Sequence, residues 1–296
     1  MSTPRNHHYV SQVLSKKFLS DVGRIYKYSK SKKQIASLNS TKNLFSQVDL
    51  NTIYDAEGNL DHKSVEDKLN VAFEKDFPKF YKVIVEAVGS NLITGMVYPQ
   101  SEQITEAASK IVEMGFVGRS RHPMDMLESQ DVIFGALLEI ANNATEELKN
   151  GIVSHIQSLS GITNKLKLDY DILAKAFVDL MGETTYSIMI APDNHYFLLP
   201  DCTAATKRFK VEDDVIDGKT FKNPAMVIGM IFMPINSKIL VLAVKAEFCP
   251  DQGHGIYHLD GETMLAYNKI LFDNAFDEVA CQNQKYLQDF KNSFLK

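Results

Sequence analysis

The sequence predicts an α+β protein, and three observations lead to this prediction. The chain has 296 residues, of which 45% are hydrophobic and 23% charged, so it can bury a sizeable core. In the middle of the chain, apolar residues recur at helical spacing. From residue 183 onward, continuous apolar runs replace this pattern, which is typical of strands buried on both faces.

Short elements are expected at the start of the chain. Residues 12–19 are predicted to form a helix, because Ser11 is a suitable N-cap residue. Residues 24–28 alternate charged and bulky side chains, which predicts a half-buried strand. Residues 43–58 show no such pattern and are expected to be irregular.

Helices then dominate the chain as far as residue 181. They are predicted at residues 61–88, 101–115, 127–159 and 169–181. In the first of them an apolar face runs from Val65 to Phe80, and Pro78 is expected to kink the helix or divide it.

A sheet and two further helices complete the predicted fold. Strands are predicted at residues 184–190, 196–199, 225–233 and 239–244. The last two strands should form a hairpin, and the charged stretch 207–224 a surface loop. The closing helices are predicted at residues 261–274 and 275–294. We therefore expect one α+β domain over residues 1–296, with a short N-terminal strand and helix unit, a helical middle of about residues 60–181, a small mixed or antiparallel sheet and two C-terminal helices.

Cysteine usage and hydropathy indicate the cellular compartment of the protein. Cys202, Cys249 and Cys281 are odd in number and far apart, which favours reduced thiols in a cytoplasm over a disulfide framework. The polar start lacks the apolar segment of a secretory signal, and the longest apolar run, residues 225–235, is too short to cross a bilayer. We therefore expect a cytoplasmic protein with no membrane segment.

The charge is distributed unevenly along the chain. The net charge is -5, but residues 1–43 hold nine Lys and Arg against one Asp, a local charge of +8 that leaves -13 for the rest. Such a basic start either docks onto its own acidic body or attracts phosphates. The second alternative makes nucleic acid a partner of the N-terminal segment, with Arg5, Lys16, Lys17 and Arg24 as binding residues.

The same segment carries a motif. It consists of His7, His8, Tyr9, Val10, Ser11 and Gln12, followed by Leu14, Phe18 and a strand that ends at Tyr28. This motif resembles the opening of the bacterial family called domain of unknown function 4238, which usually has Pro at the position of Ser11. Fainter similarity continues at Glu66 and Glu74, around Asp201, and at Asn268, which the resemblance implies as a further binding residue. The activity of that family is not established, so the resemblance implies an identity without a mechanism.

Adjacent histidines at the start are candidates for catalysis. His7 and His8 precede a short helix, as in the first half of an HNH-type nuclease signature, where a His activates water beside a metal ion. Gln12 follows His8 by four residues and is placed to orient a ligand, while Asp201 follows a predicted strand, a common position for catalytic residues. The structural alternatives are a His that fixes the N-terminal arm through a backbone hydrogen bond and an Asp that forms a turn.

Two carboxylates are candidates for a metal site. Glu66 and Glu74 lie eight residues apart on one predicted helix, which places them about 80° out of line. On a shared face they would hold a divalent metal ion, the one cofactor that the sequence indicates. The alternative is an ordinary solvated helix face.

Two functions remain open from the sequence. The chain lacks a Walker loop, a GxSxG elbow and an HExxH motif, which favours a ligand-binding or regulatory module without catalysis. The alternative is a metal-assisted hydrolase or nuclease that acts on nucleic acid through His7, His8 and nearby carboxylates. Convergence of four side chains on one pocket would favour the enzyme, namely His8, Gln12, Glu66 and Asp201. Burial of His7 and His8 against backbone carbonyls would favour the module.

Overall fold

The protein is described by a computed structural model. It describes residues 6–54, 58–90, 102–126, 145–158, 174, 177, 179, 181–210, 214–216, 219–221, 226–249 and 253–294. Arg5, the first half of the predicted helix 127–159 and most of the predicted helix 169–181 lie outside the described residues. Helices and several sheets together confirm the α+β class.

The largest sheet has five strands in the order β14-β7-β13-β12-β9. Its strands are β7 (Thr184–Ile190), β9 (Ala205–Lys210), β12 (Met226–Pro234), β13 (Ile239–Lys245) and β14 (Gly255–His258). β14 runs parallel to β7, and the other neighbours are antiparallel, so the sheet is mixed. The predicted hairpin is confirmed as β12 and β13.

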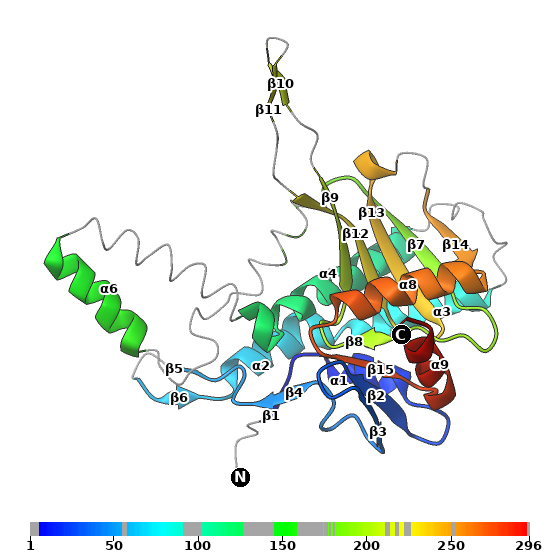
Figure 1. Ribbon diagram of the computed structural model, residues 1–296, viewed down its shortest axis with the longest axis horizontal. Helices are drawn as coiled ribbons and strands as arrows, with labels where there is room; N and C mark the ends of the chain where they lie inside the picture. The colour runs from blue at the N-terminus through cyan, green and yellow to red at the C-terminus, as the bar shows by residue number, and fades with distance from the viewer. Residues whose placement is uncertain are drawn as a thin grey trace.

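The predicted loop at 207–224 is wrong. Its first residues belong to β9, which pairs along β12 at the edge of the sheet. The next described residues form the hairpin of β10 (Asp214–Ile216) and β11 (Lys219–Phe221), which projects from the body of the protein (Figure 1). Lys207 and Arg208 are exposed on β9, and charged side chains of this kind are common on edge strands. The same charges led the sequence analysis to predict a loop.

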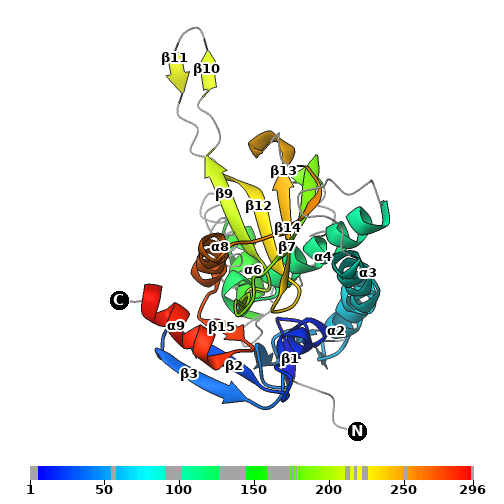
Figure 2. The same ribbon diagram turned by 90° about the vertical axis from the view of Figure 1, so that its right-hand side faces the viewer.

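Helices cover both faces of the five-stranded sheet (Figure 2). On one face Ile231 and Val241 belong to the same buried cluster as Ile111 of α4 (Glu102–Ser120). On the other face Phe232 and Leu242 join a cluster that includes α8 (Gly261–Asn274). Alternate residues of one strand therefore enter different cores, which is why these strands read as continuous apolar runs.

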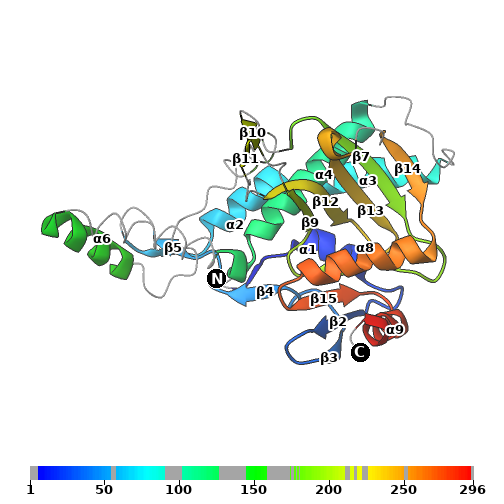
Figure 3. The same ribbon diagram turned by 45° about the horizontal axis from the view of Figure 1, so that its top comes forward.

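A second sheet joins the two ends of the chain. It has four strands in the order β3-β2-β15-β8. They are β2 (Ile25–Ser29), β3 (Gln34–Leu38), β8 (Leu199–Pro200) and β15 (Glu278–Cys281). This sheet and the five-stranded sheet lie on opposite sides of α8 (Figure 3). The predicted helix 275–294 is therefore wrong at its start: β15 pairs with β2, and only α9 (Gln284–Phe294) is helical.

Smaller elements complete the described chain. They are β1 (Asn6–His8), α1 (Gln12–Ser15), the 3-10 turn η1 (Lys16–Phe18), β4 (Ser46–Val48), β5 (Ile53–Tyr54), β6 (Leu60–Asp61), α2 (Ser64–Leu69), the π-helical turn η2 (Asn70–Glu74), α3 (Phe77–Gly89), α6 (Glu146–Ser158) and the 3-10 turn η3 (Ala246–Phe248). The predicted helix at 12–19 is confirmed, and the one at 61–88 is divided just before Pro78. Within the described chain no helix has the length and apolarity that a membrane span needs.

Candidate functional site

A pocket of about 400 Å³ opens where distant parts of the chain meet. Its wall is formed by Tyr9, Lys27, residues 43 and 45–47, residues 122–124, Asp201 and residues 277–278. These come from the N-terminal part of the chain, from the residues just after α4, from the residue after β8 and from the start of β15. Of the site residues predicted from the sequence, Asp201 alone belongs to this wall.

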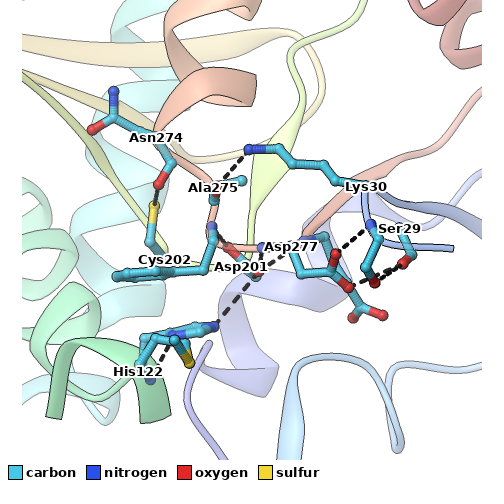
Figure 4. A network of polar contacts seen from close by, with 12 residues as sticks. Ser29, Lys30, His122, Asp201, Cys202, Asn274, Ala275 and Asp277 are labelled. Carbon is cyan, nitrogen blue, oxygen red and sulfur yellow. Dashed lines mark hydrogen bonds and ion pairs between the residues drawn. The ribbon is translucent and has the colours of Figure 1, made fainter. Parts of the chain in front are cut away.

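Asp201 holds the turn before β15 against the end of β8. Its side chain is buried, and its two carboxylate oxygens accept hydrogen bonds from three successive backbone N–H groups (Figure 4). The N–H of Phe276 donates to Oδ1 at 2.8 Å, and those of Asp277 and Glu278 donate to Oδ2 at 2.8 Å each. A charged acceptor strengthens such bonds, so this carboxylate fixes the floor of the pocket.

His122 lies beside Asp201 and was not singled out from the sequence. Its Nδ1 accepts the backbone N–H of Met124 at 3.1 Å, which leaves the ring proton on Nε2. Nε2 is 3.6 Å from Oδ2 of Asp201, an electrostatic contact that is too long for a hydrogen bond. The ring stacks on Phe276 with centroids 4.1 Å apart and meets Tyr9 edge-on at 4.8 Å. The imidazole is thus held on every side.

The charges around the pocket are partly paired. Lys27 Nζ lies 2.7 Å from Oε1 of Glu278. Burial opposes ionisation of Asp277, but hydrogen bonds from Ser31 and Ser29 bring the pKa of its carboxyl below the usual value. Burial raises the pKa of the Tyr9 hydroxyl, and the negative charges of Glu278, Asp201 and Asp277 raise it further.

A thiol and an ammonium group, those of Cys202 and Lys30, belong to the same network of polar contacts (Figure 4). Burial raises the pKa of the Cys202 thiol to about 12, so the thiol stays protonated. Burial also lowers the pKa of Lys30, whose ammonium donates a hydrogen bond to the carbonyl of Ala275 at 2.5 Å. Both groups brace the chain around residues 274–275, since Cys202 Sγ donates to the carbonyl of Asn274 at 3.4 Å.

The predicted catalytic histidines face backbone carbonyls. His7 is buried, its Nδ1 accepts the N–H of Asn51 at 2.8 Å, and its Nε2 donates to the carbonyl of His62 at 3.0 Å. His8 Nε2 is 3.0 Å from the carbonyl of Lys42, and burial lowers the pKa of this ring. Gln12 Nε2 contacts the His8 ring, at 3.0 Å from Nε2. Neither histidine nor Gln12 belongs to the pocket wall.

Glu66 and Glu74 do converge, but on an arginine. Glu74 Oε1 is 2.8 Å from Nη1 of Arg121, and Glu66 Oε1 is 3.7 Å from Nη2. Glu66 lies in α2, and Glu74 is the last residue of the π-turn η2, so the two glutamates are not part of one regular α-helix. Arg121 is buried and also donates to the carbonyl of His8. Their metal-binding role stays a prediction.

Those predicted binding residues that the structure describes do not belong to the pocket wall. Lys16, Lys17 and Arg24 are exposed, and Lys17 Nζ lies 4.2 Å above the centre of the Tyr81 ring. Asn268 is buried in α8: its Oδ1 accepts the N–H of Leu198, and its Nδ2 donates to the carbonyl of Tyr196 and the hydroxyl of Tyr286. All hydrogen-bonding atoms of this amide group thus have partners inside the protein.

No local signal marks His122 or Arg121 in the sequence. Their partners Asp201 and Glu74 lie far from them along the chain, so only the fold brings each pair together. Among the described residues, no group of three or more His, Cys, Asp or Glu side chains is arranged to hold a metal ion.

A family model described as "Protein of unknown function (DUF4238)" matches residues 6–285. No curated protein and no solved structure matches the chain.

Proposed function

We propose that this chain, which belongs to the DUF4238 family of unknown function, is a ligand-binding module without catalysis. The proposal is argued from the side chains of the chain itself. The ligand site is the pocket beside His122 and Asp201. A volume of about 400 Å³ lies within the range of small-molecule sites, and the wall combines aromatic rings with a few polar groups.

The contacts of the His122–Asp201 pair carry this proposal. A catalytic His–Asp pair needs one ring nitrogen bonded to the carboxylate and the other free to accept a proton. Here Nδ1 of His122 is already occupied by the N–H of Met124, and the Asp201 oxygens take three backbone N–H groups. These groups maintain the shape of a cavity and are poorly arranged for proton transfer.

The N-terminal histidines support the same function. His7 and His8 both contact backbone carbonyls, and Glu66 and Glu74 are engaged by Arg121. Such contacts favour a structural role for the opening motif. They give the alternative of a metal-assisted nuclease no support, and we do not advance it as a second function.

A ligand screen tests the proposal. Purified protein would be screened by thermal shift against cationic, neutral and anionic compounds of low molecular weight, and hits would be measured by calorimetry. The blocking variant is Ser46→Trp, which places an indole in the pocket wall, and the matched control is Ser37→Trp on the exposed edge strand β3. We expect hits that Ser46→Trp abolishes and Ser37→Trp keeps. Hits that survive in both variants, or no hit of any class, would refute the proposal.

A further inference from the structure

Aromatic rings meet in one wall of the pocket. The ring of Tyr9 lies 6.2 Å from that of Phe45, and 4.8 Å from that of His122 in an edge-on arrangement. All three residues line the pocket. The face of an aromatic ring carries partial negative charge and attracts a cation that lies over it.

Carboxylates add to this preference. Asp201, Asp277 and Glu278 line the pocket, and among the described residues of its wall Lys27 is the one lysine. The ammonium of Lys27 is paired with Glu278 at 2.7 Å. The negative charges of all three carboxylates raise the pKa of the Tyr9 hydroxyl. Three carboxylates against one ammonium group give the described wall of the pocket a net negative charge.

We propose that the pocket binds the cationic head of a small organic ammonium ion. This inference rests on the proposed function and names its ligand class. The rings of Tyr9 and Phe45 would contact the methyl or methylene groups next to the nitrogen, while Asp277 and Glu278 balance its charge. An anion would meet like charges in the same place, and a neutral molecule of the same shape would gain only the contacts with the rings.

The first experiment compares three probes by calorimetry at matched ionic strength. They are choline, its neutral isostere 3,3-dimethylbutan-1-ol, and acetate. Choline and the alcohol have nearly the same shape, so the difference between their affinities reports the charge alone. A partly desolvated cation is stabilised by the faces of aromatic rings, whereas the neutral alcohol is not. We therefore expect choline to bind about 10-fold more tightly than the alcohol. Acetate should not bind.

Two charge variants should shift choline affinity in opposite directions. Glu278→Gln removes a carboxylate and leaves Lys27 without its partner, so choline binding should weaken about 5-fold or more. Lys27→Gln removes the competing ammonium, so binding should tighten. Neither substitution changes the size of the side chain greatly, and circular dichroism would verify that both variants are folded.

A ring variant tests the aromatic wall. Tyr9→Leu should remove the preference for choline over the alcohol. The matched control is Tyr81→Leu, since the Tyr81 ring also lies beneath an ammonium group, that of Lys17, but outside the pocket. The control should keep the preference. If Tyr9→Leu does not fold, the opposite shifts of the two charge variants decide the question.

The outcomes separate this inference from the proposed function. Tight choline binding with the expected shifts supports both. Equal affinity for choline and the alcohol, a preference for acetate, or a screen whose pocket ligands are all neutral or anionic overturns the ammonium ligand and leaves the binding module standing. Absence of binding by every class, in the screen and in these titrations, overturns both.

Discussion

Replacing Asp201 by Asn tests whether its carboxylate holds the pocket together. In the native protein Oδ1 accepts one backbone N–H and Oδ2 accepts two. An Asn has a single acceptor oxygen, which can keep the two bonds from Asp277 and Glu278 if it takes the place of Oδ2. Its amide NH₂ group then faces the N–H of Phe276, and two donors are set against each other.

The cost follows from this geometry. One hydrogen bond to a charged acceptor is lost, at about 1.5–3 kcal/mol, and the two that remain lose their charge assistance. We therefore expect the free energy of unfolding of Asp201→Asn to fall by about 2–4 kcal/mol. The measurement is urea denaturation followed by circular dichroism at 25 °C.

The control is Asp289→Asn on α9. Asp289 is exposed and pairs with Lys285 at 2.9 Å across one helical turn, so its loss should cost less than about 0.5 kcal/mol. If Asp201→Asn behaves like this control, the carboxylate does not carry the turn before β15, and the account of the pocket given above fails.

Two further predictions concern packing and thiol chemistry. A methyl group added by Gly118→Ala would lie 2.7 Å from Oγ1 of Thr203, so we expect a loss of about 1–3 kcal/mol in the free energy of unfolding. Gly151→Ala, with open space around its position in α6, should be neutral or stabilising by up to about 1 kcal/mol, and equal effects in urea denaturation would contradict this reasoning. Burial raises the pKa of the Cys202 and Cys281 thiols to about 12, so both stay protonated below that pH and react only after unfolding. A chromogenic thiol reagent at pH 8 should find one half-buried thiol in the native protein and three in urea, and rapid reaction of all three in the native protein would refute the prediction.

The fold could be predicted where local pattern and final burial agree. β7 and α8 lie where the sequence predicts them, because a strand buried on both faces and a capped helix each have a local signature. β15 has none. Its residues Val279 and Ala280 form a short apolar stretch that suits a helix or a strand equally, and its partner β2 lies near the other end of the chain.

The candidate site was predictable only in part. Asp201 could be identified because a carboxylate at a strand end is a recognisable position. His122 could not, since its ring is held by Tyr9 and Phe276 from distant parts of the chain. The π-turn η2, which ends at Glu74, could not be foreseen either, because the sequence analysis placed Glu66 and Glu74 on one regular helix.

The pairing of β2 with β15 sets the order in which this protein can be completed during synthesis. Tyr28 pairs with Val279, so about 250 further residues must be synthesised after β2 before its partner strand β15 is available. At a translation rate of about 5–20 residues per second, that delay is about 13–50 s. The five-stranded sheet can form earlier, because its last strand ends at His258. The pocket is therefore among the last parts to form, and a nascent chain that carries every strand of the larger sheet still cannot bind a ligand there.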